Sequence, residues 1–201
     1  MERFQVLSPL ASALAHIHQH GIVFRDVKAD NVGIDNQGMV KLFDFGLAKE
    51  LPRQEQPPGW TGTYQLTGNT GTLIYMAPEV QRNQPYGTAV DVYSLSILIQ
   101  QVLSLESCPF DPEDEVGIRR AVMDQGFRPT VPEAWPEALR ELLPQMWTED
   151  ASQRPSAQAV ATSLTDMLQT EVDQILQMEA ASAPTNSSSS LSWTRYWKGK
   201  K

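Results

Sequence analysis

Apolar residues recur every three or four positions near the start of the chain. They are Phe4, Leu7, Leu10, Ala11, Leu14 and Ile17. Because this is the spacing of one face of an α-helix, the pattern predicts an amphipathic helix over residues 4–18. Gly21 follows shortly afterwards, where a glycine commonly ends a helix.

Two short apolar runs come next, Asn31–Ile34 and Met39–Phe43. The four residues between them, Asp35-Asn36-Gln37-Gly38, favour a turn, so this stretch predicts a small β-hairpin. From Leu51 to Thr72 the chain is rich in Pro, Gly, Thr and Gln and has no apolar period. A loop of this length is usually functional or disordered.

Three later segments predict helices. Residues 90–105 are apolar almost throughout, as in a helix buried on most sides. Glu137–Trp147 and Ser156–Met178 each carry one apolar face, and Ser156 is a suitable N-cap. From about residue 180 the sequence is Ser-rich and ends in WTRYWKGKK. We therefore predict a mainly α-helical domain with a small β-hairpin over 1–179 and a disordered Ser-rich and basic tail over 180–201.

Composition narrows the class of protein. The chain has 201 residues, enough for one globular domain, and its apolar runs are too short to span a bilayer. The residues after Met1 lack the pattern of a signal peptide, so we expect none, and Cys108 is the only cysteine, so no disulfide forms within this sequence. A formal charge of −8 argues against non-specific nucleic-acid binding. We expect a protein of the cytoplasm or nucleus with no transmembrane segment.

Five short motifs occur in a fixed order. They are FRDVKADN at 24–31, DFG at 44–46, GTLIYMAPE at 71–79, DVYSLS at 91–96 and WTEDASQRP at 147–155. Taken singly, the first motif also suits an ordinary polar turn. In this order and spacing the motifs resemble the C-terminal lobe of a eukaryotic-type protein kinase over residues 4–178.

The resemblance implies an α+β kinase lobe that uses ATP and Mg²⁺ to phosphorylate proteins. Asp26 would orient the substrate hydroxyl and accept its proton, while Lys28 would reach toward the transferred phosphate. Asn31 and Asp44 match the metal ligands, since both offer hard oxygen atoms. Asn31, Gly33 and Asp44 together match the nucleotide site.

Two residues bear on the substrate. Lys28, two positions after the catalytic aspartate, and Thr72, which matches a threonine that contacts that aspartate and lysine, are typical of kinases directed at Ser or Thr. A small-molecule phosphotransferase is disfavoured, because the APE motif and the Gly71-Thr72 pair belong to kinases with peptide substrates.

The resemblance also places an activation segment between Asp44 and Glu79. Arg25 adjoins the catalytic aspartate and would pair with a phosphate on that segment. The hydroxyls available are those of Thr61, Thr63, Tyr64, Thr67 and Thr70. The alternative is a flexible polar loop that carries no phosphate.

Five matching residues are expected to hold the shape of the site. Phe45 and Gly46 complete the DFG motif. Asp91 matches a helix aspartate that accepts hydrogen bonds from the backbone of the catalytic loop. Glu79 and Arg154 match a buried ion pair, of the kind whose half-removal costs about 3–5 kcal/mol.

The chain departs from the family pattern at Phe24, Gly33 and Ser96, and also at Ala29 and Asp30, which replace a frequent Pro-Glu pair and matter less. Phe24 replaces a histidine, and its ring is expected to keep the packing against Phe45. Gly33 replaces a bulky aliphatic residue under the adenine, which predicts lost apolar contact and weakened or reshaped nucleotide binding. Ser96 replaces a glycine in the buried helix, where its hydroxyl is expected to bond to the helix backbone.

The three histidines raise the question of a metal site, because His16 and His20 lie four residues apart. Only His18 and Cys108 remain as further nitrogen or sulfur ligands, too few for a convincing zinc site. We expect surface or helix-capping histidines instead.

No glycine-rich loop, N-lobe lysine or glutamate partner precedes the first helix in this sequence. We therefore expect a C-lobe without an N-lobe, weak or inactive as an isolated chain, with an apolar surface that a partner covers. The alternative is a non-catalytic, pseudokinase-like regulatory or binding module. The basic, aromatic end of the tail is expected either to solubilise the chain or to touch an acidic partner or membrane surface.

Overall fold

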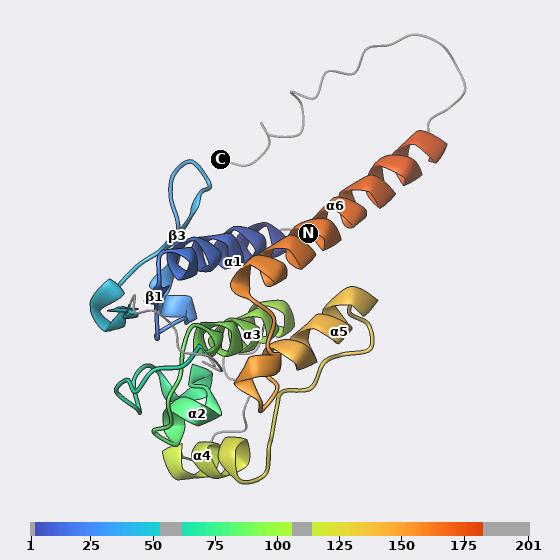
Figure 1. Ribbon diagram of the computed structural model, residues 1–201. Helices are drawn as coiled ribbons and strands as arrows, with labels where there is room; N and C mark the ends of the chain where they lie inside the picture. Colours follow the sequence, from blue (N-terminus) through green and yellow to red (C-terminus); the bar gives the residue numbers. More distant parts are fainter. Residues whose placement is uncertain (1–2, 53–61, 106–113, 183–201) are drawn as a thin grey trace.

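The computed structural model describes residues 3–52, 62–105 and 114–182 (Figure 1). Helices dominate this part of the chain. They are α1 Phe4–Gln19, α2 Pro78–Gln81, α3 Ala89–Ser104, α4 Glu115–Met123, α5 Glu137–Met146 and α6 Ala157–Ser182. Single 3₁₀ turns lie between them at η1 Ala29–Asn31, η2 Phe45–Leu47, η3 Leu73–Tyr75 and η4 Ala151–Gln153.

Among the described residues, the β-strands form two short antiparallel pairs. β2 (Val32–Ile34) pairs with β3 (Val40–Leu42), with Gly33 opposite Lys41, which confirms the predicted hairpin. β1 (Ile22–Val23) pairs with β4 (Lys49–Glu50) and closes the base of the loop that precedes η1. The prediction of a mainly α-helical fold with a small hairpin is therefore confirmed.

Two helices form the centre of the lobe. Every residue of α3 from Val90 to Gln100 is buried, because this helix has apolar or internally bonded side chains all round. Ser96 donates its hydroxyl hydrogen to the Tyr93 carbonyl at 2.6 Å, as predicted. α1 lies alongside α6 and buries Leu7, Leu10 and Leu14 (Figure 1).

Some elements lie outside the predicted ones. The β1–β4 pair and α4 were not expected from the apolar pattern, and α6 continues to Ser182, past the predicted end at Met178. Ser156 caps α6 as predicted, because its Oγ accepts a hydrogen bond from the Ala159 amide at 3.1 Å. Most of the predicted tail, residues 183–201, lies outside the described residues. Within the described part, no helix combines the length and apolarity that a bilayer crossing requires.

Candidate active site

A buried aspartate of α3 fixes the loop after β1. The two carboxylate oxygens of Asp91 accept hydrogen bonds from the backbone amides of Phe24 and Arg25, each at 2.8 Å. Asp91 is 0% exposed, so an unpaired charge there would be costly and the bonds are strongly favoured. The arrangement also holds Arg25 at a φ of 71°, a conformation rare for residues with a side chain.

The histidine prediction was wrong for His18. Its Nε2 lies 2.8 Å from Asp91 Oδ2, and its side chain is only 11% exposed, so it supports the loop instead of lying at the surface. His20 does remain exposed, with its Nδ1 at 2.8 Å from the His16 carbonyl oxygen. The contact between His18 and Asp91 joins residues 73 positions apart, which helix periodicity alone does not reveal.

Asp26 is the centre of a dense hydrogen-bond network. Its Oδ2 lies 2.9 Å from both Lys28 Nζ and Asn31 Nδ2. Its Oδ1 accepts from the Thr72 hydroxyl at 2.9 Å and from the Thr72 amide at 3.1 Å. Lys28 also donates to Thr72 Oγ1 at 3.1 Å, so four of the predicted site residues are brought together. An ionised carboxylate offers about four lone-pair sites, and these donors fill them.

This network sets the protonation state of the site. Burial of the Asp26 carboxyl opposes its ionisation, but hydrogen bonds from Lys28, Thr72 and Asn31 outweigh burial and lower its pKa. The bond to Asp26 raises the pKa of Lys28. Asp26 therefore stabilises the fold above its unfolded value of about 3.9, and this contribution is lost as the pH falls through the lowered pKa. The contribution of Lys28 is complete below about 10.4 and lost as the pH rises through its raised pKa.

Gly71 lets the activation segment approach the loop. Its φ is +100°, and a Cβ atom at this position would overlap the backbone carbonyl oxygen of Arg25. Only glycine brings the Thr72 amide this close to Asp26 without strain. The Gly71-Thr72 pair was singled out from the sequence. The reason for the glycine was not, because it lies in the Arg25 carbonyl oxygen, 46 residues earlier in the chain.

Gly71→Ala is expected to destabilise the chain by about 1–3 kcal/mol and to weaken the Thr72–Asp26 contact. Urea unfolding measures the first effect. Gly126→Ala is the matched control, because Gly126 also has a positive φ but has open space around its Cβ position. Equal losses of stability in the two variants would show that the close contact at Gly71 contributes nothing.

Comparison with known proteins agrees with this geometry. The family model described as "Protein kinase domain" matches residues 2–164. The chain belongs to the protein kinase family. The FRDVKADN, DFG and APE motifs all fall inside the matched residues.

Several curated kinases are similar to this chain. The serine/threonine-protein kinase STY46 of Arabidopsis thaliana is 32% identical over 82% of this chain and 27% of its own length. The mitogen-activated protein kinase kinase kinase 13-B of Xenopus laevis is 31% identical over 77% of this chain and 15% of its length. The dual specificity protein kinase shkB of Dictyostelium discoideum is 30% identical over 92% of this chain and 26% of its length. The chain thus spans about a quarter or less of these relatives.

The DFG motif lies on the exposed surface of the lobe. Asp44 has a φ of 56°, and its Oδ1 accepts a hydrogen bond from the Gly46 amide at 3.1 Å. The Phe45 ring packs edge-on against Phe24, with 5.2 Å between ring centroids. Phe24 therefore keeps the packing expected of it.

The donor set fits Mg²⁺. Within the described residues, no three His, Cys, Asp or Glu side chains are grouped to hold a metal ion. Mg²⁺ does not need such a group, because it keeps several waters and binds one or two carboxylates together with phosphate oxygens. The Asn31 amide donates its NH₂ to the backbone oxygen and carboxylate of Asp26, so its side-chain carbonyl oxygen is the atom that could serve as a metal ligand.

An aromatic ring occupies the space beside Gly33. A Cβ atom at Gly33 would overlap the ring of Phe43, which fills the position that a larger residue 33 would take. The Phe43 amide donates to the Asn31 carbonyl at 2.8 Å, which holds its backbone beside the hairpin. Phe43 is 52% exposed, so its ring presents apolar surface beside Gly33, while weakened or reshaped nucleotide binding stays a prediction. The sequence did not mark Phe43, since nothing in its spacing relates it to Gly33.

Arg25 is already engaged in the structure. Its Nε donates to the Leu47 carbonyl at 2.6 Å, and its Nη1 lies 3.3 Å from the Tyr86 hydroxyl. That hydroxyl donates to the Thr67 carbonyl at 2.6 Å, so Arg25 is connected to the activation segment through Tyr86. Pairing of Arg25 with a phosphate stays a prediction, and Thr61 lies outside the described residues.

The predicted ion pair joins the APE motif to η4. Arg154 Nη1 and Nη2 donate to the two oxygens of Glu79 at 2.6 and 2.9 Å. The Arg154 side chain is 0% exposed, and its Nε donates to the Thr148 carbonyl at 3.0 Å. Glu79 is 8% exposed, so each of these two buried charges is neutralised by the other.

Proposed function

We propose that this lobe transfers the γ-phosphoryl group of ATP to serine and threonine hydroxyls of proteins. The observation that carries the proposal is that Lys28 and Thr72 both donate to the Asp26 carboxylate and also contact each other. Relatives that are named serine/threonine kinases support it. Because shkB is named a dual specificity kinase, the choice between Ser, Thr and Tyr acceptors is tested by experiment.

The chemistry follows from the network around Asp26. An incoming hydroxyl replaces one of the four donors on the carboxylate, which fixes its oxygen in line with the phosphorus atom. The oxygen forms the new bond to phosphorus as the bond to ADP breaks, and its proton passes to Asp26. Because its pKa is lowered, Asp26 is a weak base that mainly orients the hydroxyl. Lys28 offsets the negative charge that gathers on the phosphoryl oxygens.

Bound ATP and Mg²⁺ would supply the phosphoryl group and neutralise its charge. Asn31 and Asp44 would hold the metal, and the Phe43 ring beside Gly33 would offer apolar contact to the nucleotide.

Exposed apolar side chains surround this site. Ile34, Met39, Phe43, Phe45 and Leu47 are each between 38% and 59% exposed. Such a cluster marks a surface that another protein segment covers. We propose that a glycine-rich kinase lobe covers this surface in the active state. We also propose that the protein works in the cytoplasm.

A chimera tests the proposal. A glycine-rich lobe from a serine/threonine kinase is fused ahead of residue 1, and radiolabelled phosphate transfer to Ser, Thr and Tyr peptides is measured. We expect Ser and Thr labelling that exceeds that of the 201-residue chain by about 100-fold or more, because the added lobe positions the nucleotide. The chimera with Asp44→Asn is the background control.

The same experiment separates the alternative of a non-catalytic binding module. A chimera that unfolds cooperatively but labels peptides no better than its Asp44→Asn variant would reject the kinase proposal. The exposed apolar surface would then favour the binding module. Robust turnover by the isolated 201-residue chain would instead overturn the expectation that the chain needs the second lobe.

A further inference from the structure

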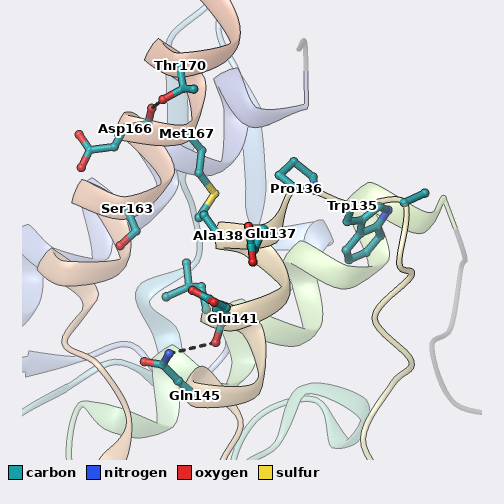
Figure 2. Close-up of a pocket in the computed structure, with 12 residues that line it drawn as sticks. Trp135, Pro136, Glu137, Ala138, Glu141, Gln145, Ser163, Asp166, Met167 and Thr170 are labelled. Carbon is teal, nitrogen blue, oxygen red and sulfur yellow. Dashed lines mark hydrogen bonds between the residues drawn. The ribbon is translucent and has the colours of Figure 1, made fainter.

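A groove runs between α5 and α6 on the side of the lobe away from the catalytic loop (Figures 1 and 2). Its volume is about 1000 Å³. Apolar side chains contribute to its walls, and buried or half-buried ones among them are Trp135, Leu142 and Met167. Figure 2 shows the two helices facing each other across this space.

The rim of the groove is acidic. Glu137 and Glu141 of α5 and Asp166 of α6 line it, all three are exposed, and no lysine or arginine is among the lining residues. In the described part of the chain these carboxylates form no ion pair with a basic side chain. They also do not form a metal-binding group. A groove that combines apolar side chains with unneutralised carboxylates suits a segment that combines aromatic residues with cations.

The chain itself contains such a segment. Residues 193–201, WTRYWKGKK, hold three aromatic and four basic residues and no acid. They account for 4 of the 16 lysines and arginines, so the remaining chain has 12 basic against 24 acidic residues. The kinase chemistry uses neither this segment nor the groove.

Chain length permits contact within one molecule. The groove ends at Thr170 on α6, and that helix runs twelve residues further to Ser182, or about 18 Å at 1.5 Å per residue. Residues 183–192 reach about 33–36 Å when extended, so the connection can return along the helix with slack. A short connection of this kind gives a local concentration in the millimolar range.

We propose that residues 193–201 dock in the groove between α5 and α6 of the same molecule. Aromatic side chains of the segment pack against Trp135, Leu142 and Met167, and its cations pair with Glu137, Glu141 and Asp166. Docking of this kind closes the groove to other basic partners and leaves the catalytic loop open. It requires no nucleotide, so its test is independent of the kinase proposal.

Photo-crosslinking of the full 201-residue chain tests the docking. p-Benzoyl-phenylalanine is placed at position 196, the protein is irradiated at low concentration, and the linked peptides are identified by mass spectrometry. We expect links to residues 134–145 and 163–170 within one chain. Links to other surfaces, links only between two chains, or no links would each overturn the proposal.

Charge reversal provides the matched control. Glu141→Lys with Asp166→Lys is expected to lower the yield of these links about tenfold, because two attractions become repulsions. Glu115→Lys with Asp124→Lys alters net charge equally, at exposed residues of α4 and its C-terminal end, and should keep the yield within about twofold. If thermal melting shows that the groove variant is unfolded, Glu141→Gln with Asp166→Asn takes its place. Equal yields in the groove and control variants would contradict the proposal.

Discussion

Asp26→Asn is expected to lower phosphoryl transfer by the chimeric kinase about 10²–10⁴-fold, the range typical of a positioned acid–base group. The asparagine keeps the shape of the side chain but replaces one acceptor oxygen with a donor NH₂. That group then faces donors from Lys28 and Asn31 or from Thr72, and some of the hydrogen bonds are lost. Peptide phosphorylation at saturating ATP measures the effect.

Thr72→Val tests how much the Thr72 hydroxyl contributes by orienting the Asp26 carboxylate, while the charge of Asp26 is kept. This variant removes the hydroxyl that donates to Asp26 and accepts from Lys28, but it keeps the Thr72 backbone amide and the contact between Lys28 and Asp26. The loss should be smaller than in Asp26→Asn, and the pKa of Asp26 should rise toward its ordinary value because one lowering contribution is gone. Equal losses in both variants would show that the carboxylate has no role beyond holding Thr72.

The pH dependence of stability gives a second measure of the same network. In the parent chain, the stabilisation from ionised Asp26 is complete above about pH 4 and disappears as the pH falls through its lowered pKa. Asp26→Asn has no such titration, so the difference in stability between the two proteins should shrink on acidification. A difference that stays constant down to pH 2 would contradict the role assigned to the charge.

Most helices of the lobe, and its hairpin, could be predicted from local sequence patterns. The helices α1, α3, α5 and α6 each bury a periodic or continuous apolar face, and the hairpin is marked by its turn residues. α4 escaped prediction because its buried residues are few, Ile118 and Val122. The β1–β4 pair spans only two residues per strand, too short to show alternation.

The site was predictable where a motif carries it and not where contact depends on the fold. Asp26, Lys28, Asn31 and Thr72 came from short motifs, and the structure brings them into one network. By contrast, the role of His18 depends on the contact between α1 and α3 that brings it to Asp91. Neither the overlap at Gly33 nor the acidic groove leaves a local signal, because each arises from side chains that only the folded chain brings together.

Arg154→Met is expected to destabilise the chain by about 3–5 kcal/mol, because it leaves the Glu79 carboxylate buried without its partner. The same change removes the Arg154 bonds to the Thr148 and Ala89 carbonyls and its contact with the Tyr93 ring, 5.2 Å from its guanidinium carbon. Urea unfolding with linear extrapolation measures the loss.

A double-mutant cycle isolates the pair itself. Glu79→Leu should also be destabilising, but the double variant Glu79→Leu with Arg154→Met should lose less than the sum of the single losses, since neither charge is then left alone. The exposed pair Asp35 and Lys41, with 3.4 Å between Oδ2 and Nζ, is the control and should contribute about 0–1 kcal/mol. Additive losses at Glu79 and Arg154 would show that the two side chains stabilise the lobe separately, through packing and backbone contacts, and not as an ion pair that ties the APE motif to η4.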